Sequence, residues 1–295
     1  MRIAVLASPK SWYLADLRRA AAARHEIVPA SFANFQASIG TERDGVTSGL
    51  DLAFDEMDAV LVRTMPPGSL EQVVFRMDAL ARLEERGMPV INPARSIEAA
   101  VDKYLATAKL HAAGLLVPRT IVCQTADEAM AAFAELGGDV VLKPLFGSEG
   151  RGITRLDDEA LALRAFKMLA QLGAVLYLQE FIQHDGYDLR VLKIGRRFFG
   201  MRRSNAEDWR TNVSRGAVAS PVELHPEWIE MAERAAAAIG APVAGVDLLP
   251  STDGRLFAIE VNAVPGWQAL SRALRVDIAD VVLKFLSDAA KRTSP

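Results

Sequence analysis

The chain has 295 residues, of which 51% are hydrophobic and 24% are charged, and its formal net charge is -3. This length is typical of two or three packed subdomains, the composition is that of an ordinary soluble globular protein, and the small negative charge gives no reason to expect a nucleic-acid partner. The single cysteine, Cys123, excludes an internal disulfide and a cysteine-based metal site, as expected in a reducing compartment.

The N-terminal part alternates strand-like and helix-like runs. Strands are expected at residues 2–8, 59–64 and 89–94, and helices at 12–25 and 69–87, while 30–52 are too irregular to place. This order predicts a parallel sheet with covering helices. The apolar start is too short for a signal peptide, and no run approaches the roughly 18 apolar residues of a membrane span. We therefore expect a cytoplasmic protein without membrane contacts.

The pattern changes at Ser96. A helix is expected over 96–114, with Ser96 and Ala99 as a weak capping box, and Thr125 is expected to cap a second helix over 125–138. Strands are expected at 117–123, 140–146 and 175–182, and one further helix is expected at 157–172. The remainder contains antiparallel strands at 188–195 and 197–203, a helix at 225–240, a hairpin and a C-terminal helix. We predict an α/β protein, α+β in its second half, with three subdomains over 1–95, 96–175 and 176–295.

A glycine-rich stretch, "KPLFGSEGRG", follows Lys143 at the end of an apolar strand. Gly147, Gly150 and Gly152 allow positive φ and a close approach of backbone N–H groups to an anion, which Lys143 would help to neutralise. The spacing matches neither common phosphate-binding glycine motif, and Glu149 would repel a phosphate. Taken alone, the stretch therefore favours a β-hairpin turn over a phosphate loop.

The hairpin "GVDLLPSTDGRLFAIEVNAVPG" is more informative. Asp253-Gly254 is typical of a two-residue type I′ turn, which pairs residues whose numbers add up to 507 and places Asp247 opposite Glu260, with Asn262 on the same face. The other face is then apolar: Val246, Leu248, Phe257, Ile259 and Val261. Two facing carboxylates repel unless a cation lies between them, and hard oxygen ligands favour Mg²⁺ or Mn²⁺. A solvated hairpin face with an incidental pair of acids is the alternative.

Two further polar regions are candidates for binding. The strand ending at Ile182 offers backbone groups to an adenine edge, and Asp188 is placed to hold ribose hydroxyls or simply to flank a turn. Five arginines and Asn212 form a basic cluster, which is either a solvated charge run or a set of bidentate donors for carboxylate and phosphoryl groups: Arg190, Arg202, Arg203, Arg210 and Arg215. Neither Ser148 nor Cys123 has a recognisable base partner, so nucleophilic catalysis is not expected.

In this order, the features resemble the ATP-grasp superfamily, and within it the RimK-like α-L-glutamate ligases. The resemblance runs from "DKYLATAKLHAAGLLVP" through "VVLKPLFGSEGRGI", "YLQEFI", "YDLRVLKIG" and "MRRSN…WRTNVSRGA" to "GVDLL" and "AIEVNAVPG". It covers roughly Ser96 to the C-terminus, and the family also carries a Rossmann-like N-terminal domain. The wording "KPLFGS" is similar to that of enzymes that glutamylate pterin-type coenzymes.

The resemblance implies a role for each matching residue. Lys103 and Lys143 would bind the ATP phosphates under a flap formed by Gly147, Ser148, Gly150 and Gly152. Glu180 and Ile182 would frame the adenine, and Asp188 would hold the ribose. The metal ligands for two ions would be Asp247, Glu260 and Asn262, and the acyl phosphate and amino acid would be oriented by Arg190, Arg203, Arg210 and Asn212.

The implied reaction is ATP-dependent amide-bond formation. A carboxylate attacks the γ-phosphate of ATP, and an amine, expected to be that of L-glutamate, displaces phosphate from the acyl phosphate. The acceptor is expected to be a pterin-type coenzyme or a peptide, and the protein a homo-oligomer. A small-molecule kinase and a non-catalytic ATP-binding module are the alternatives; ADP release that requires both a carboxylate and an amine distinguishes the ligase from both.

Overall fold

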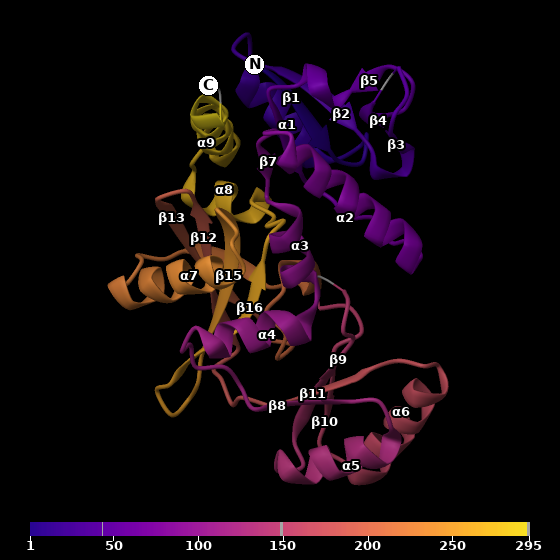
Figure 1. Cartoon of the computed structure of the whole chain (residues 1–295). Coiled ribbons are helices and arrows are strands. Elements are labelled where there is room, and N and C mark those ends of the chain that lie inside the picture. The colour runs from indigo at the N-terminus through magenta and orange to yellow at the C-terminus, as the bar shows by residue number, and fades with distance from the viewer. Residues whose placement is uncertain (43, 148–149, 294–295) are drawn as a thin grey trace.

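The N-terminal residues form the expected parallel sheet in a computed structural model that describes residues 1–42, 44–147 and 150–293. The strand order is β2-β1-β6-β7, with β1 at Arg2–Leu6, β2 at Glu26–Ala30, β6 at Ala59–Val62 and β7 at Val90–Ile91. Helices α1 (Trp12–Ala21) and α2 (Leu70–Glu85) connect these strands (Figure 1). A capping box of Ser69 and Gln72 starts α2, which ends before Gly87, whose φ is +85°.

Residues 30–52, which the sequence left unplaced, contain a small antiparallel sheet. Its strands are β3 (Phe35–Ser38), β4 (Gly45–Ser48) and β5 (Leu52–Ala53), with short 3₁₀ helices η1 (Phe32–Asn34) before it and η2 (Phe54–Glu56) after it. The rings of Phe32 and Phe54 each pack against Phe35. A cluster of three aromatic side chains therefore supplies the core that so short a sheet requires.

The helix expected over residues 96–114 is two helices, α3 (Ala94–Val101) and α4 (Lys103–Ala112). Asp102 interrupts the run, because its carboxylate accepts a hydrogen bond from Leu105 N at 3.0 Å and caps α4. The predicted cap at Ser96 is wrong: Ser96 lies inside α3, and its hydroxyl donates to Gly240 O at 2.7 Å. The interruption places Lys103 at the first residue of α4.

The central sheet has the strand order β10-β9-β11-β8. Its strands are β8 (Thr120–Cys123), β9 (Val140–Lys143), β10 (Thr154–Leu156) and β11 (Leu176–Glu180), and its helices are α5 (Ala126–Glu135) and α6 (Glu159–Gln171). One face packs on both helices and forms a hydrophobic core of its own (Figure 1). Thr125 caps α5 as expected, by accepting a hydrogen bond from Glu128 N.

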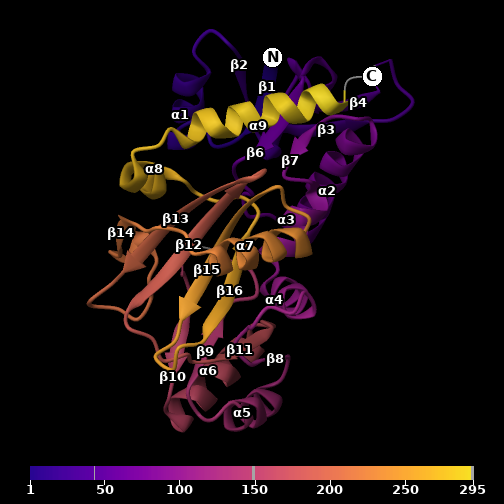
Figure 2. The ribbon, with the colours of Figure 1, turned by 90° about the vertical axis from the view of Figure 1, so that its left-hand side faces the viewer.

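The C-terminal sheet is antiparallel and has the order β14-β13-β12-β15-β16. Its strands are β12 (Tyr187–Ile194), β13 (Arg197–Ser204), β14 (Val218–Pro221), β15 (Val243–Pro250) and β16 (Leu256–Asn262). The short 3₁₀ helix η3 (Val213–Arg215) precedes β14, and α7 (Pro226–Ala238) contacts β12, β15 and β16. After β16 come α8 (Gln268–Leu274) and α9 (Ile278–Thr293), and α9 returns to pack against α1 (Figure 2).

The β15–β16 hairpin has the expected pairing of Asp247 with Glu260 but a different turn. Ser251 N donates to Arg255 O at 2.8 Å and only Gly254 has positive φ, so the two-residue type I′ turn is wrong and the loop is one residue longer. A bulge at Ile259 restores the register toward Asn262. Ala258 therefore joins Val246, Leu248 and Val261 in the core that α7 covers, in place of the expected Phe257 and Ile259.

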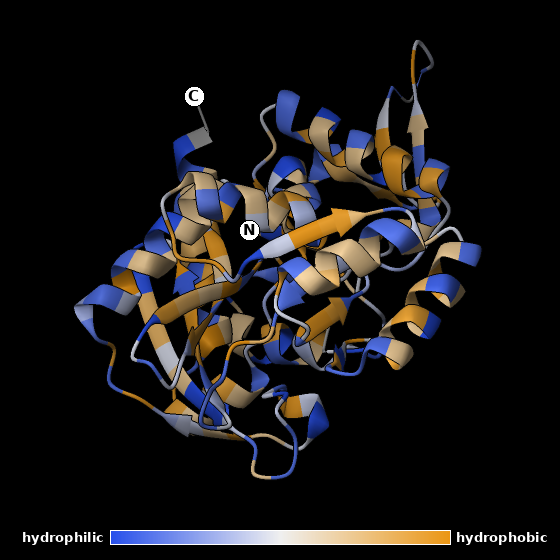
Figure 3. Cartoon of the chain, turned by 90° about the horizontal axis from the view of Figure 1, so that it is seen from below, coloured by the Kyte–Doolittle hydropathy of each residue, from blue (hydrophilic) through white to orange (hydrophobic). Residues whose placement is uncertain are grey.

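Two hydrophobic cores join the N-terminal part to the C-terminal part. One contains Val60 and Leu80 together with Val246, and the other contains Leu17 together with Leu283. In Figure 3 the strands carry long hydrophobic stretches, whereas the helices alternate hydrophobic and hydrophilic residues. Because β11 extends the central sheet past the predicted boundary at residue 175, we propose a boundary after residue 180. In the described residues, no helix has the length and apolar character needed to cross a membrane.

Candidate active site

The polar face of the C-terminal sheet carries the predicted acids and two of the arginines. Alternation along β15 turns Val246 and Leu248 toward the core under α7, and it turns Asp247 to the opposite face. Asp247 has Arg190 of β12 as its neighbour on one side and Glu260 of β16 on the other. Residues that are far apart in the sequence thus meet because the register of three strands aligns them.

A buried chain of charges runs across this face. Arg190 Nη1 lies 2.7 Å from Asp247 Oδ1, and Arg203 Nη2 lies 2.9 Å from Asp247 Oδ2. Arg203 also holds Asp188 through both oxygens, with Nε to Oδ1 at 2.7 Å. Burial alone would lower the pKa of Arg203, but Asp247 and Asp188 outweigh it and the net shift is upward. Arg203 is therefore a permanent cation between two carboxylates, and removing one partner of such a set typically costs 3–5 kcal/mol.

Glu260 differs from Asp247 in having no hydrogen bond or ion pair to any described residue, although its side chain is half-buried. The amide oxygen of Asn262 accepts from Val264 N at 2.7 Å, which fixes the turn after β16. Among the described residues, no group of three or more His, Cys, Asp or Glu could hold a metal ion. The candidate donors are two carboxylates and an amide, and this hard-oxygen set, with Glu260 uncommitted, fits Mg²⁺ shared with phosphate oxygens.

Two lysines face these acids from other elements. Lys143, at the end of β9, donates to Gln179 Oε1 at 2.6 Å, and burial lowers the pKa of its ammonium to about 8. Lys103, at the start of α4, also has a pKa lowered by burial. The charge of Glu260 raises the pKa of both lysines, so the three groups share one field. The structure thus brings together the predicted phosphate-binding lysines and the predicted metal-binding acid.

The glycine loop lies against the basic residues. All three predicted glycines have positive φ: +146° at Gly147, +69° at Gly150 and +72° at Gly152. Lys103 Nζ donates to Gly147 O at 2.9 Å and Arg215 Nη2 to Gly150 O at 3.0 Å. Ser148, which was expected to be part of the flap, and Glu149, whose role was left open, lie outside the described residues. The remainder of the loop is attached to the site through its carbonyl groups.

The loop after β13 supplies two of the predicted substrate-orienting residues. The guanidinium of Arg210 pairs with Asp208 at 2.6 Å and donates to Ile153 O at 3.3 Å. Asn212 contacts the glycine loop so closely that a Cβ at Gly150 would clash with its amide oxygen. Both residues therefore support the glycine loop, whereas Arg190 lies beside Asp247.

Three residues were expected around the nucleoside, namely Glu180, Ile182 and Asp188, and their side chains have different environments. The side chain of Ile182, just past the end of β11, is buried, and Glu180 on that strand forms an ion pair with Arg119 at 2.7 Å. Asp188 is only 1% exposed; its oxygens accept from Arg203 and, at 2.6 Å, from Thr211 Oγ1. Both oxygens of Asp188 thus already accept hydrogen bonds inside the protein, which favours a structural role, and the ribose contact expected from the sequence stays a prediction.

A buried polar network beside Lys143 was missed by the sequence analysis. Gln179 Nε2 donates to Thr120 Oγ1 at 2.9 Å and to Tyr177 Oη at 3.2 Å, and Tyr177 Oη lies 2.8 Å from Thr107 Oγ1 of α4. The period of two along β11 was a usable signal, because it places Tyr177 and Gln179 on the face opposite the central core. This network connects the central sheet to α4.

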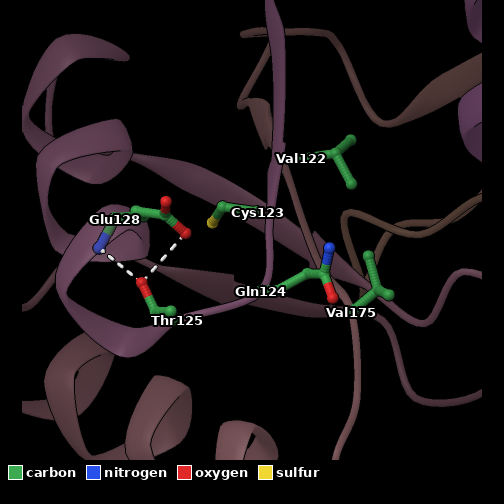
Figure 4. Close-up of a pocket in the computed structure, with 6 residues that line it drawn as sticks. All are labelled: Val122, Cys123, Gln124, Thr125, Glu128 and Val175. Atoms are coloured by element: carbon green, nitrogen blue, oxygen red, sulfur yellow. Dashed lines mark hydrogen bonds between the residues drawn. The ribbon is translucent and has the colours of Figure 1, made fainter.

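A pocket of about 380 Å³ opens at the start of α5 (Figure 4). Its lining consists of Val122, Cys123, Gln124, Thr125, Glu128 and Val175, and therefore none of the predicted site residues. The carboxylate of Glu128 accepts from Thr125 Oγ1 at 2.9 Å and thereby serves the helix cap. Burial raises the pKa of the Cys123 thiol, which agrees with the expectation that it is no nucleophile.

Comparisons with known proteins agree on one family. Residues 100–286 match the RimK-like ATP-grasp domain. A tetrahydromethanopterin:alpha-L-glutamate ligase of Methanosarcina acetivorans is 32% identical over 267 residues, which cover 81% of this chain and 82% of that protein. The crystal structure of a RimK domain ATP-grasp protein from Sphaerobacter thermophilus covers 97% of this chain and 99% of its own, with 25% identity and a TM-score of 0.75. The ATP-grasp ligase PsnB, complexed with minimal precursor, shares the fold at 24% identity, with a TM-score of 0.77 over 97% of this chain and 98% of that chain.

Proposed function

The chain belongs to the RimK-like ATP-grasp family, and we propose that it joins the amino group of L-glutamate to a carboxylate of a pterin-type coenzyme. It is an ATP-dependent ligase that forms carbon–nitrogen bonds, and it uses ATP with Mg²⁺. The pterin acceptor is supported by a relative that is 32% identical over 81% of this chain and is a tetrahydromethanopterin:alpha-L-glutamate ligase. We also propose that the protein is a cytoplasmic homo-oligomer and that it binds two magnesium ions. Light scattering measures the oligomeric state, and metal titration measures the number of ions.

The assignment of the site is carried by one observation: Lys103 and Lys143 lie close enough to Glu260 for its charge to raise the pKa of both lysines. We assign the two lysines to the phosphates of ATP. Their depressed pKa values reflect a cost of burying the ammonium groups, and an approaching polyphosphate offsets that cost. The glycine loop, which Lys103 and Arg215 hold by its carbonyl groups, covers the phosphates and excludes water from the acyl phosphate.

Glu260, Asp247 and Asn262 are the residues that would hold magnesium. Bound there, Mg²⁺ would neutralise charge on the phosphate oxygens as the γ-phosphoryl group is transferred. Glu260 has no competing partner among the described residues, and each oxygen of Asp247 keeps one lone pair beyond its arginine contact. The two arginines thus orient the Asp247 carboxylate without consuming its capacity to bind a metal ion.

We propose that Arg190 stabilises the carboxylate and the phosphoryl group that react at this place. It is the arginine beside Asp247, and a fork of N–H donors suits both anions. Arg203 and Asp188 are buried and bind each other, so we propose that they position Asp247, which Arg203 also contacts. Glu180 and Ile182 remain the proposed frame of the adenine, and Arg210 and Asn212 act through the glycine loop that they contact.

The reaction balances in two steps. An oxygen of the acceptor carboxylate attacks the γ-phosphorus, and the bond from that phosphorus to the bridging oxygen of ADP breaks. The amino group of L-glutamate then attacks the acyl carbon, inorganic phosphate leaves with the carboxylate oxygen, and the nitrogen loses its proton to solvent. The protein contributes mainly cations that match the developing negative charge.

The test is ADP release by the full chain with Mg²⁺, ATP, L-glutamate and tetrahydromethanopterin, with mass spectrometry of the product. We expect a glutamyl adduct, one ADP per adduct, and no ADP release when either L-glutamate or the acceptor is omitted. ADP release that needs the acceptor alone, with a phosphorylated acceptor as the final product, would instead identify a kinase. The absence of a glutamyl adduct with this acceptor, alongside an adduct with a peptide acceptor, would overturn the pterin assignment.

A further inference from the structure

Arg63 has an environment that the proposed function does not explain. It directly follows β6 at the C-terminal edge of the parallel sheet, and only 8% of it is exposed. Its guanidinium carbon lies 4.6 Å from the ring centroid of Tyr13 and 4.2 Å from that of Trp267. Its Nη2 donates to Pro265 O at 2.8 Å. The guanidinium is thus held against two aromatic rings, which themselves contact each other edge to face.

No carboxylate neutralises this charge in the part of the chain that the structure describes. Among the described residues, the guanidinium of Arg63 donates only to Pro265 O, and its buried Nε has no partner. The nearby Asp16 is engaged elsewhere: it accepts from Trp267 Nε1 at 3.0 Å and pairs with Arg19 at 2.7 Å. Burial lowers the pKa of Arg63 to about 10, so the group is still charged at neutral pH. A buried cation without an anion is costly, and a bound anion would remove that cost.

The place of Arg63 is close to the proposed site. A Cβ at Gly245 would lie 3.0 Å from Pro265 Cβ and 3.1 Å from Arg190 Nε, so Pro265, which accepts from Arg63, and Arg190, which binds Asp247, both lie beside Gly245. Figure 2 shows the N-terminal sheet and α8 at the same end of the C-terminal sheet. The carboxyl edge of parallel strands is also where α/β sheets bind ligands.

A second donor lies at the same position. The hydroxyl of Tyr13 forms no hydrogen bond with any described residue. The chain approaches it so closely that a Cβ at Gly266 would lie 2.5 Å from Tyr13 Oη. A side chain at position 266 would therefore displace Tyr13, and the Tyr13 hydroxyl contacts the same loop that contains Pro265.

We propose that Arg63 and the hydroxyl of Tyr13 bind a substrate carboxylate that is not the one activated by ATP. This inference rests on the proposed function, because a ligase that uses L-glutamate must hold carboxylates that do not react. Two sources offer this chemistry: the two carboxylates of L-glutamate, and a second anionic group of the acceptor. A charge-assisted contact of this kind contributes about 10- to 100-fold to binding.

The kinetic test compares three variants of the full chain. Arg63→Gln is expected to raise KM about 10- to 100-fold for either L-glutamate or tetrahydromethanopterin, with kcat and the KM of ATP nearly unchanged, and Arg63→Lys should restore part of that loss. The matched control is Arg76→Gln, since Arg76 is 6% exposed and its guanidinium donates, among the described residues, only to Pro66 O and Pro67 O. The substrate whose KM rises identifies the source of the carboxylate. The proposal is overturned if Arg63→Gln behaves like Arg76→Gln.

A binding test is independent of turnover. In the presence of Mg-ADP, thermal unfolding is followed against L-glutamate, tetrahydromethanopterin and glutarate, a five-carbon dicarboxylate. We expect wild type and Arg76→Gln to gain stability at the same concentrations of at least one of these, and Arg63→Gln to need about 10- to 100-fold more. Identical titrations for all three proteins would overturn the inference. A missing glutamyl product from wild type would instead refute the proposed function, and the binding result would still stand.

Discussion

Raising the pH from 7 to 9 is expected to weaken nucleotide binding through Lys143. Burial holds the pKa of this lysine at about 8, so its ammonium group loses its charge as the pH rises through that value. The protonated fraction falls from about 0.9 at pH 7 to about 0.1 at pH 9. If only the charged form binds the phosphates, the apparent Kd rises in inverse proportion to that fraction, which is about tenfold.

Calorimetric titration of the protein with Mg-ADP at several pH values measures this dependence. Lys143→Arg is the matched control, because a guanidinium keeps its charge over the whole range. We expect the variant to bind more weakly or equally at pH 7 but to show a flat profile up to pH 9. A flat profile for wild type, or an equally steep one for Lys143→Arg, would refute the assignment of Lys143 to the phosphates.

Three further predictions concern the acids and the glycine loop. Glu260→Gln should lower kcat by about 100-fold or more, because it removes a proposed metal ligand, and should change Tm little, because Glu260 has no partner in the described residues. The control, Glu233→Gln, should leave turnover intact, since Glu233 pairs only with Lys193 among the described residues. Equal turnover of both variants would contradict the metal assignment. Asp188→Asn should lower the free energy of unfolding in urea by about 3–5 kcal/mol, because Arg203 then loses one of its two carboxylate partners. A higher KM for ATP without loss of stability would instead support the ribose contact. Arg215→Gln should speed hydrogen exchange in the glycine loop, and unchanged exchange would contradict its anchoring role.

The hairpin shows how far the sequence predicted the site. The pairing of Asp247 with Glu260 follows from a turn signal and the period of two, and it is confirmed. The turn itself differs, and the bulge at Ile259 compensates for the longer loop. A bulge has no clear signature in one sequence, because any residue of a strand can occupy it. Local patterns therefore predicted the facing acids, whereas the route of the chain between them depended on tertiary packing.

Contacts between residues that are far apart in the sequence could not be predicted from the sequence alone. Asp188 was expected to hold ribose hydroxyls or to flank a turn, but the register of β12 with β13 places it opposite Arg203 and buries both. Arg63 reads as an ordinary polar residue near the end of the expected strand 59–64, since its aromatic neighbours come from positions 13 and 267. A side chain's partner is fixed by the strand order and by loop closure, and a single sequence states neither.

The most direct test of the central claim uses tetrahydromethanopterin whose carboxylates carry ¹⁸O. Ligation through an acyl phosphate transfers one labelled oxygen to inorganic phosphate for each glutamyl product, because the carboxylate oxygen that attacked the γ-phosphorus leaves with the phosphate. We predict this stoichiometry, strictly dependent on L-glutamate. Unlabelled phosphate in the presence of glutamyl product, or labelled phosphate released at the same rate without L-glutamate, would contradict it.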